Sequence, residues 1–358
     1  MSNVIFVDHT SKLGGGELAL SRYLKWQDKA CTVDLIVFED GELADIARVS
    51  PGVTVHIIKA KSKLQRVVEL SLLLQRLEGT VVANSLSSLI HLSLVPQVTG
   101  RLVYYLRHEA FTPDTSAKKK IFMKNFVFPR CIGFLANSQY TLETLELPRF
   151  IRRGKVVYTV SGTQTTDNSQ YIEPIVDKLR ILSLSRLTPW KGVHYIIEAV
   201  NKYNCSNPAV RATLTVAGGA LFGEEEYEAS LKHQAENDEA VTFVGNVGDI
   251  YPLLQEHDIL VSASIKPEPF GQILVQGQSA GLMTIATDQG GAKEIVSSGE
   301  TGLLVEAASS QELVVALQWV AENAQQVQNI RKNGKISSRK FNDDKTLLML
   351  EQALLELM

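Results

Sequence analysis

Long apolar segments are missing from this sequence, and their absence excludes several classes of protein. No run approaches the roughly 18 uninterrupted apolar residues that a membrane-spanning helix needs. The first residues carry no basic segment, and their apolar run, Val4–Val7, is short. We interpret that run as a buried first strand rather than a secretion signal, and we expect a cytoplasmic protein.

Cysteine is scarce, and histidine forms no cluster. The three cysteines, Cys31, Cys131 and Cys205, are far apart and share no metal-ligand spacing. A scattered, odd-numbered set is typical of a cytosolic protein, so we expect three reduced, buried thiols. Hydrophobic residues make up 45% of the chain and charged residues 21%, a globular composition that excludes a disordered or fibrous protein.

Charge is unevenly distributed, although the net charge is only -3. Residues 1–155 contain 21 Lys and Arg against 14 Asp and Glu, which gives +7, and the remainder contains 15 against 25, which gives -10. The basic residues of the first half include three runs: Lys59, Lys61, Lys63 and Arg66; Lys118, Lys119, Lys120 and Lys124; Arg149, Arg152, Arg153 and Lys155. We expect an anionic partner for this half, such as a membrane surface or a phosphorylated acceptor.

Length and pattern together predict two α/β domains. A chain of 358 residues is long for one core. Short apolar runs alternate with amphipathic segments such as Leu64–Leu77, which predicts parallel sheets covered by helices on both faces. The expected strands of the first half are Val4–Asp8, Val33–Phe38, Val53–Ile58, Val81–Ala83, Leu102–Leu106 and Cys131–Ala136. Those of the second half are Arg180–Ser185, Ala212–Ala217, Val241–Val244, Ile259–Ser262 and Met283–Thr287.

The alternating pattern loosens in a polar stretch that begins near Val160. We place an N-terminal domain at residues 1–160, a linker at 161–178 and a C-terminal domain at 179–340. The last residues, 341–358, contain an apolar helix that closes the C-terminal domain or packs back on the first. Ligands of doubly wound sheets bind at the carboxyl ends of the strands, so we expect a ligand cleft between the domains.

Four loops at expected strand ends of the second half carry residues suited to a phosphate or a sugar. Ser262–Gly271 leaves a strand and opens a helix, whose free N–H groups attract anions. Asp288–Glu294 contains two glycines that permit unusual backbone conformations. Ser185–Gly192 carries two cations suited to a pyrophosphate, and Ala217–Gly219 ends the next strand similarly. Together the loops predict a site for a nucleoside diphosphate.

These loops resemble the motifs of the retaining family 4 glycosyltransferases, also called group 1 glycosyltransferases. The family's Arg…Lys-Gly pair, Glu-Pro-Phe-Gly segment and Gly-Gly-x-x-Glu loop correspond to Arg186…Lys191-Gly192, Glu268–Gly271 and Gly290–Glu294. In the first half, similar segments are Leu13–Glu17, Arg107–Glu109 and Ala136–Ser138. The resemblance covers residues 4–335 and implies the GT-B fold, two Rossmann-like doubly wound parallel-sheet domains with a cleft between them.

The resemblance also implies a role for each matching residue. Arg186 and Lys191 would bind the donor diphosphate and stabilise the departing nucleotide, and Glu268 would hold hydroxyls of the transferred sugar. With these three, His108 completes the implied catalytic group. The other donor-binding residues implied are Gly15, Gly16, Gly218, Gly219, Val247, Pro269, Phe270, Gly271, Gln272, Gln276 and Glu294. The residues implied on the acceptor side are Glu17, Arg107 and Glu109.

Two of these residues have simpler explanations, and one departs from the family pattern. Glu17 could only stabilise the first turn of its helix, where the dipole favours an acid. A lone histidine such as His108 is more often structural. The family's second glutamate, which holds the nucleotide ribose, is Gln276 here; an amide still offers an acceptor and two donors, but the negative charge is lost.

The function implied is a retaining transfer of a sugar from a UDP- or GDP-sugar to a hydroxyl acceptor, in the synthesis of a cell-surface polysaccharide, a lipopolysaccharide or a glycolipid. No Asp-x-Asp motif stands at a convincing strand end, so we expect no metal and no other cofactor. The expected partners are a nucleotide sugar, a glycan or lipid-linked acceptor and an anionic membrane surface on the inner face of the cell membrane, and not a nucleic acid. Two alternatives remain open, a non-catalytic GT-B subunit that supports a partner transferase and a sugar-nucleotide epimerase.

Overall fold

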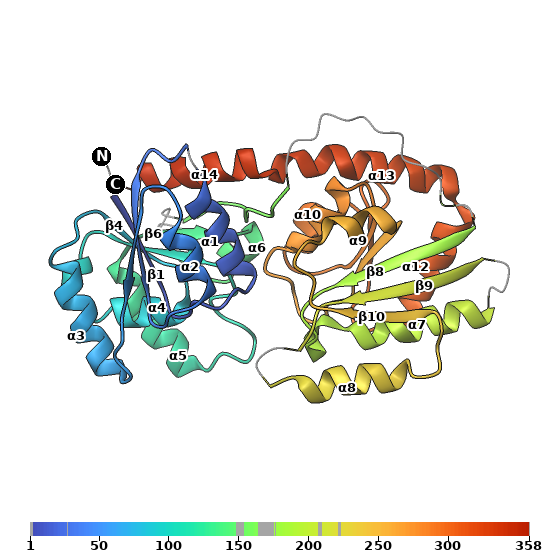
Figure 1. Cartoon of the computed structure of the whole chain (residues 1–358), viewed down its shortest axis with the longest axis horizontal. Coiled ribbons are helices and arrows are strands. Elements are labelled where there is room, and N and C mark those ends of the chain that lie inside the picture. Colours follow the sequence, from blue (N-terminus) through green and yellow to red (C-terminus); the bar gives the residue numbers. More distant parts are fainter. Residues whose placement is uncertain are drawn as a thin grey trace. The chain divides into compact units, whose positions relative to one another are not determined.

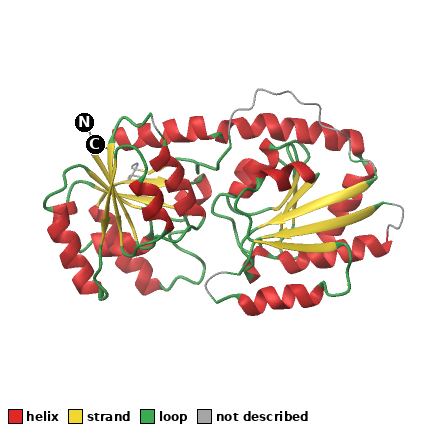
Figure 2. Cartoon of the chain, viewed as in Figure 1, coloured by secondary structure: helices red, strands yellow, loops and turns green. Residues whose placement is uncertain are grey.

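The computed structural model describes residues 3–26, 28–147, 154–163, 175, 177–206, 210–220 and 223–357. The chain divides into two compact units, unit 1 (Met1–Gln164 with Phe341–Met358) and unit 2 (Thr165–Lys340). Each unit is a parallel sheet with helices on both faces, so the predicted α/β class is confirmed (Figures 1 and 2). Most of the predicted linker, 161–178, lies outside the described residues, as do Arg149, Arg152 and Arg153.

The sheet of unit 1 has the strand order β3-β2-β1-β4-β5-β6-β7, and every pair is parallel. Its strands are β1 (Asn3–Asp8), β2 (Thr32–Val37), β3 (Val53–Ile57), β4 (Thr80–Ala83), β5 (Leu102–Leu106), β6 (Cys131–Ala136) and β7 (Gly154–Val156). The order reverses between β1 and β4, and this switch point is where doubly wound sheets bind ligands. The edge strand β7 was not predicted because its three residues carry no pattern.

Alternate residues of β1 face two separate cores. Ile5 and Val7 belong to the core covered by α3 (Lys63–Leu74), α4 (Leu86–Leu92) and the π-helical turn η2 (Met123–Val127), which continues α5 (Ala117–Phe122). Val4 and Phe6 belong to the core covered by α1 (Gly15–Lys25), α2 (Glu42–Arg48) and α14 (Asp343–Leu355). A short helix, α6 (Gln139–Glu143), follows β6. Unit 1 is therefore a sheet between two helical layers.

The C-terminal helix α14 packs on unit 1 through a buried carboxylate. Glu351 is 5% exposed and accepts hydrogen bonds from the Tyr23 hydroxyl (2.6 Å), the Ala30 backbone N–H (2.7 Å) and the Cys31 thiol (3.3 Å). Burial, reinforced by Glu351, raises the pKa of the Cys31 thiol to about 12, which keeps it protonated. Cys131 is also buried, whereas Cys205 is exposed, so the prediction of three buried thiols was wrong for Cys205.

Replacing Glu351 by alanine should destabilise unit 1 markedly. The change leaves the buried Tyr23 hydroxyl without its acceptor and also removes the acceptor of the Ala30 N–H, and we expect a loss of about 3 kcal/mol in the free energy of unfolding. The measurement is urea unfolding followed by circular dichroism. Glu356→Ala is the matched control, because Glu356 lies just beyond the same helix in an exposed ion pair with Lys155. Equal losses for both variants would contradict this account of α14.

Unit 2 repeats the architecture with the strand order β10-β9-β8-β11-β12-β13. Its strands are β8 (Lys178–Leu184), β9 (Arg211–Ala217), β10 (Val241–Gly245), β11 (Ile259–Ser262), β12 (Met283–Thr287) and β13 (Leu303–Val305). Its helices are α7 (Val193–Ser206), α8 (Glu225–Gln234), α9 (Tyr251–Glu256), α10 (Gln272–Ser279), α11 (Ala292–Ile295), α12 (Ser310–Glu322) and α13 (Ala324–Ser338). The central strands β11 and β12 are buried on both faces, as their continuous apolar sequence requires.

The switch point of this second sheet lies between β8 and β11. Helices α7 and α12 pack on each other, and α10 packs with α13 against β12. Among the described residues, none of the helices has the combination of length and apolar character that crossing a membrane requires.

Candidate functional site

Five loops follow the parallel strands β8 to β12, and close backbone contacts fix them to one another. Gly192 adopts a left-handed backbone (φ 68°), and a β-carbon there would lie 2.0 Å from the carbonyl oxygen of Ala263. The Ile265 N–H donates to the Trp190 carbonyl at 2.7 Å. The loops after β8 and β11 therefore meet at the switch point, and only glycine at position 192 permits that approach.

The loop after β9 lies against the loop after β8 in the same way. Gly218 has φ 125°, and a β-carbon there would lie 1.9 Å from the Ser185 carbonyl oxygen. The Leu187 N–H donates to the Gly219 carbonyl at 3.0 Å. The amide of Asn246, in the loop after β10, would lie 3.0 Å from a β-carbon at Gly219. The predicted glycines 218 and 219 are thus required for the loops to pack together, whatever they bind.

The loop after β12 holds the backbone of Glu268. Gly290 pairs with Glu268 as an isolated β-bridge, and the Gly291 N–H donates to the Glu268 carbonyl at 2.7 Å. A β-carbon at Gly290 would lie 2.4 Å from that carbonyl oxygen. The side chains of Thr287 and Gln289 both donate to the Ser264 carbonyl at 2.8 Å. Glu268 is therefore fixed at its backbone from the neighbouring loop.

The side chain of Glu268 is buried, 6% exposed, and pairs through one oxygen only. Its Oε1 accepts from the Ser264 hydroxyl at 2.5 Å and forms an ion pair with Lys191. Within the described residues its Oε2 accepts no hydrogen bond, and that oxygen remains accessible. Lys191 also lies over the Trp190 ring, 4.2 Å from the ring centre. The carboxylate is thus preorganised, with one oxygen left for a ligand hydroxyl.

Two further positive groups lie in these loops. Arg186 follows β8, and its Nε lies 3.9 Å from Glu224 Oε2, a distance too long for a hydrogen bond. The N-terminus of α10 begins after Gly271, whose φ of 104° favours glycine. First-turn N–H groups lack partners within a helix, and the helix dipole adds positive potential there. Cations and a helix terminus together suit an anionic ligand.

The remaining predicted residues of unit 2 lie around this centre. Phe270 and Gln276 are buried, Gln276 in the second turn of α10. Pro269, which precedes Phe270, and Gln272, which follows Gly271, are half-buried. Glu294 lies half-buried in the single turn of α11, and Val247 lies half-buried in the loop after β10. The structure therefore places all the predicted residues of unit 2 in the loops that follow β8, β9, β10, β11 and β12, or in the helices that begin there.

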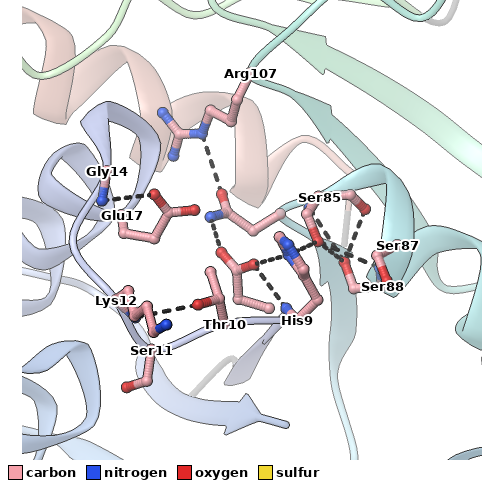
Figure 3. A network of polar contacts seen from close by, with 12 residues as sticks. His9, Thr10, Ser11, Lys12, Gly14, Glu17, Ser85, Ser87, Ser88 and Arg107 are labelled. Atoms are coloured by element: carbon pink, nitrogen blue, oxygen red, sulfur yellow. Dashed lines mark hydrogen bonds and ion pairs between the residues drawn. The ribbon is translucent and has the colours of Figure 1, made fainter. Parts of the chain in front are cut away.

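The predicted residues of unit 1 lie near the switch point of its own sheet. Helix α1 begins at Gly15, so Gly15 and Gly16 lie in its first turn. The Glu17 carboxylate caps this turn by accepting from the Gly14 N–H at 3.1 Å (Figure 3). Burial, with a contribution from Asp8, raises the pKa of Glu17. Glu17 therefore has a structural role whether or not it also binds a ligand.

Arg107, His108 and Glu109 differ in their surroundings. Arg107 is buried; its guanidinium donates to the Asn84 side-chain oxygen at 3.1 Å and lies 3.7 Å from the centre of the Tyr105 ring. His108 is exposed. Glu109 is half-buried and accepts from the Tyr140 hydroxyl at 3.2 Å. Arg107 therefore orients its neighbours, while His108 is accessible to a ligand.

A polar network around Asp8 was not among the predicted site residues. Asp8 ends β1, is completely buried, and accepts from the Asn84 amide at 2.6 Å. Its other oxygen lies 3.1 Å from His9 Nδ1, which also lies 2.9 Å from the Ser85 hydroxyl. A carboxylate only accepts, so Nδ1 carries the proton and Nε2 presents a lone pair. The Asp-His pair at the end of the first strand is the signal that could have identified this network.

Asp8 should control the protonation of His9. The hydrogen bond to Asp8 raises the pKa of His9, and burial opposes it more weakly. A raised histidine pKa favours the folded state at low pH, and that stabilisation is lost as the pH rises through the pKa of the folded protein. Asp8→Asn should therefore lower the pKa of His9, and the stabilisation of the folded state should then be lost at lower pH.

The measurement is an NMR titration of the seven histidine ring signals. His9→Gln identifies the His9 signal, and the six other histidines serve as internal controls. A His9 pKa that does not fall in Asp8→Asn would contradict the pairing.

Across the described residues, no group of three or more His, Cys, Asp or Glu side chains is placed to hold a metal ion.

Comparisons with known proteins agree with this arrangement. Residues 165–337 match the family described as glycosyl transferases group 1. The chain is 30% identical over 156 residues to the putative glycosyltransferase YtcC of Bacillus subtilis, which is 42% of this chain and 38% of that protein. It is 30% identical over 132 residues to a glycogen synthase of Mycobacterium tuberculosis, which is 36% of this chain and 31% of that protein. The chain thus matches well under half the length of these curated relatives.

Solved structures match over the whole chain. Anabaena Alr3699/HepE in complex with UDP and glucose has a TM-score of 0.82 and 26% identity, over 99% of this chain and 100% of that one. The same protein in complex with UDP-glucose has a TM-score of 0.80 and 25% identity, over 99% of each chain. Sucrose-phosphate synthase from Thermosynechococcus elongatus shares the fold, with a TM-score of 0.77 and 16% identity over 100% of this chain and 99% of that one.

Proposed function

We propose that this chain, which belongs to the group 1 glycosyl transferases through residues 165–337 and has the GT-B fold, transfers a sugar from a nucleoside diphosphate sugar to a hydroxyl acceptor. One observation carries the proposal. The half-buried Lys191 and the buried Ser264 and Glu268 form one group at the switch point of the second sheet, with Glu268 Oε2 left open. A carboxylate oxygen beside a lysine suits a sugar that is joined to a diphosphate.

Protein groups of opposite charge would bind the diphosphate and the sugar of the donor. The diphosphate would bind at the N-terminus of α10, and Lys191 and Arg186 would supply positive charge beside it. A lysine ammonium has three donors, so Lys191 can keep its pair with Glu268 while it donates to a phosphate oxygen. Glu268 Oε2 would accept from a sugar hydroxyl. As the bond between the sugar and the diphosphate breaks, negative charge grows on the phosphate, and the cations stabilise it.

We further propose that the donor is a UDP-sugar. Support comes from the Anabaena structures, which are described with UDP, with UDP and glucose and with UDP-glucose. The ribose would lie by Gln276 and the base by Val247. The reaction would retain the anomeric configuration. It would need no metal ion, because Lys191 and Arg186 would neutralise the charge of the diphosphate. The leaving phosphate would accept the proton of the acceptor hydroxyl.

The acceptor hydroxyl would be bound by unit 1 at its switch point. His9 Nε2 has a lone pair for a hydroxyl, and His108 is exposed in the loop after β5. The acceptor would be a glycan or a lipid-linked sugar, and the product a cell-surface polysaccharide, a lipopolysaccharide or a glycolipid.

A panel of nucleotides tests the donor part of the proposal. Isothermal titration calorimetry with UDP, GDP and ADP, followed by their sugar conjugates, should show the strongest binding for the uridine compounds. Arg186→Ala should weaken the binding of UDP, because one phosphate contact is lost. No heat of binding from any nucleotide would refute the proposed donor site.

Gln276 favours a second function, a non-catalytic subunit that supports a partner transferase. The amide carries no charge, so any role that needs an anion at this position is lost. Donor binding without turnover, with activity only in the presence of a partner, would favour the subunit. Turnover by the isolated chain, made faster by Gln276→Glu, would favour the enzyme. Conversion of a UDP-sugar to its epimer without an acceptor would instead indicate an epimerase.

A further inference from the structure

Helix α3 is apolar on two opposite sides. Its inner side buries Leu70 and Leu74 in the core of unit 1. On the outside, Leu64, Val68 and Leu72 recur every fourth residue and are 76%, 51% and 56% exposed. This spacing places the three side chains in one stripe along the helix. A single exposed leucine is ordinary, but a stripe of three calls for a physical cause.

The segment α5–η2 repeats this arrangement with aromatic residues. Met123 and Val127 of η2 are buried in the core that also receives α3. Ile121, Phe122 and Phe126 are exposed, Phe126 by 65%. The rings of Phe122 and Phe126 stack on each other, with centres 5.9 Å apart. The segment therefore presents a small apolar cluster to solvent.

Basic residues surround both apolar groups. Residues 59–76 contain five Lys or Arg and one acid, and residues 114–130 again contain five and one, which makes ten cations against two acids. Lys120 and Lys124 share Glu146 at 2.7 and 2.8 Å. Lys118 and Lys119 are exposed in the first turn of α5, and Lys61 and Lys63 are exposed at the start of α3. We call this outer side of the layer the basic–apolar surface (Leu64, Val68, Leu72, Ile121, Phe122, Phe126, Lys61, Lys63, Lys118 and Lys119).

We propose that the basic–apolar surface binds a bilayer that contains anionic lipids. Both helical segments belong to the same layer, on the face of the sheet that carries Ile5 and Val7 (Figure 1). Phenylalanine and leucine side chains enter the boundary between headgroups and acyl chains, while lysines reach the phosphates beside them. Charge and apolar area act together, so neither group of residues binds alone. The chain would thus attach reversibly and present its acceptor side to lipid-linked molecules.

A second copy of this chain fits the same surface less well. A symmetric dimer would place the surface against itself and bring the lysines of both copies together. Like charges repel unless acids lie opposite, and this surface has few acids. The opposite layer of unit 1 differs, because its exposed apolar residues, such as Val49 at the end of α2, are scattered.

Vesicle flotation tests the proposal with the full chain, without donor or acceptor. Vesicles of phosphatidylcholine with about a third phosphatidylglycerol should bind the protein at low salt, and pure phosphatidylcholine should not. Lys118→Gln/Lys119→Gln should weaken binding roughly 30-fold, because each lysine contributes a factor of about five. Phe122→Ser/Phe126→Ser should weaken it by more than about tenfold. High salt should screen the lysines and release the protein from the vesicles.

Matched controls change the same residue types elsewhere. Val49→Ser alters an exposed apolar residue of the opposite layer, and Lys178→Gln/Lys332→Gln removes two exposed lysines of unit 2. Both controls should bind like the parent protein. The proposal is overturned if the parent does not float with anionic vesicles, or if binding survives both surface variants. It is also overturned if the phenylalanine variant instead dissociates a dimer in light scattering. None of these outcomes depends on donor binding or turnover, so they are distinct from a failure of the proposed catalysis.

Discussion

Replacing Lys191 by alanine should lower kcat/KM for sugar transfer by about 10² to 10³-fold. In the free protein Lys191 pairs with Glu268 and lies over the Trp190 ring, which holds its ammonium in one place. We expect its main effect in the transition state, where the leaving diphosphate gains charge. The loss should therefore appear in kcat more than in the KM for the donor. The measurement is the initial rate of UDP release at several donor concentrations.

Lys232→Ala is the control for this prediction. Lys232 forms an exposed ion pair with Glu228 on α8 at 2.7 Å, so the variant also loses a lysine and an ion pair of unit 2. It should keep nearly full activity. The assigned role of Lys191 fails if both variants retain activity, or if Lys191→Ala has lost activity only because it no longer folds, as a thermal melt would reveal.

Gly290→Ala should lower kcat/KM by about 10²-fold although residue 290 has no chemical group to offer a substrate. The backbone at this position is left-handed (φ 64°), and a β-carbon would lie 2.4 Å from the Glu268 carbonyl oxygen and 2.7 Å from its nitrogen. The two loops must therefore separate, and Glu268 moves with its loop. A shift of about 1 Å in a substrate-binding group costs a factor of this size. Activity and urea unfolding are measured on the same variant.

The matched substitution is Gly299→Ala. Gly299 has a similar left-handed backbone (φ 79°), but a β-carbon there would meet nothing within 4 Å. Both variants carry the conformational cost of about 1–2 kcal/mol, so only the contact with Glu268 distinguishes them. Gly299→Ala should lose stability but keep its activity. Similar activity losses in the two variants would show that the loop contact does not position Glu268.

Much of this fold was predictable because the strands of a doubly wound sheet are apolar runs between turn signals. The strands β5, β6, β11 and β12 were predicted to the residue. The loops after the strands could be chosen as a ligand site because parallel strands bring their carboxyl ends to one edge. The α/β class and the group 1 resemblance are confirmed, whereas the roles of the individual site residues stay predictions.

Other features depend on contacts that a sequence pattern does not contain. The strands β7 and β13 have three residues each, too few for a periodicity. The tight approach of Gly290 to Glu268 joins positions that are far apart in the sequence. The sequence places His9 beside Asp8 but carries no information about the burial of either side chain. Only the fold shows Asp8 completely buried and held by Asn84, which comes from another strand end.

The exposed apolar side chains of α3 and α5 could not be predicted from the sequence either. The pattern of α3 fits a core helix, and nothing in it says which apolar residues remain outside. The basic runs predicted an anionic partner from charge alone, but the stacked Phe122 and Phe126 add apolar contact to that prediction.

Consumption of a radiolabelled donor tests the central claim most directly. The parent protein and Glu268→Ala are each incubated with labelled UDP-, GDP- and ADP-glucose, with water as the minimal acceptor, and the release of labelled sugar is followed. Glu268 holds the sugar in our account, so the parent should consume the UDP-sugar, and Glu268→Ala should do so at least about 10²-fold more slowly. No consumption of any donor by the parent, or equal rates for the parent and Glu268→Ala, would contradict it.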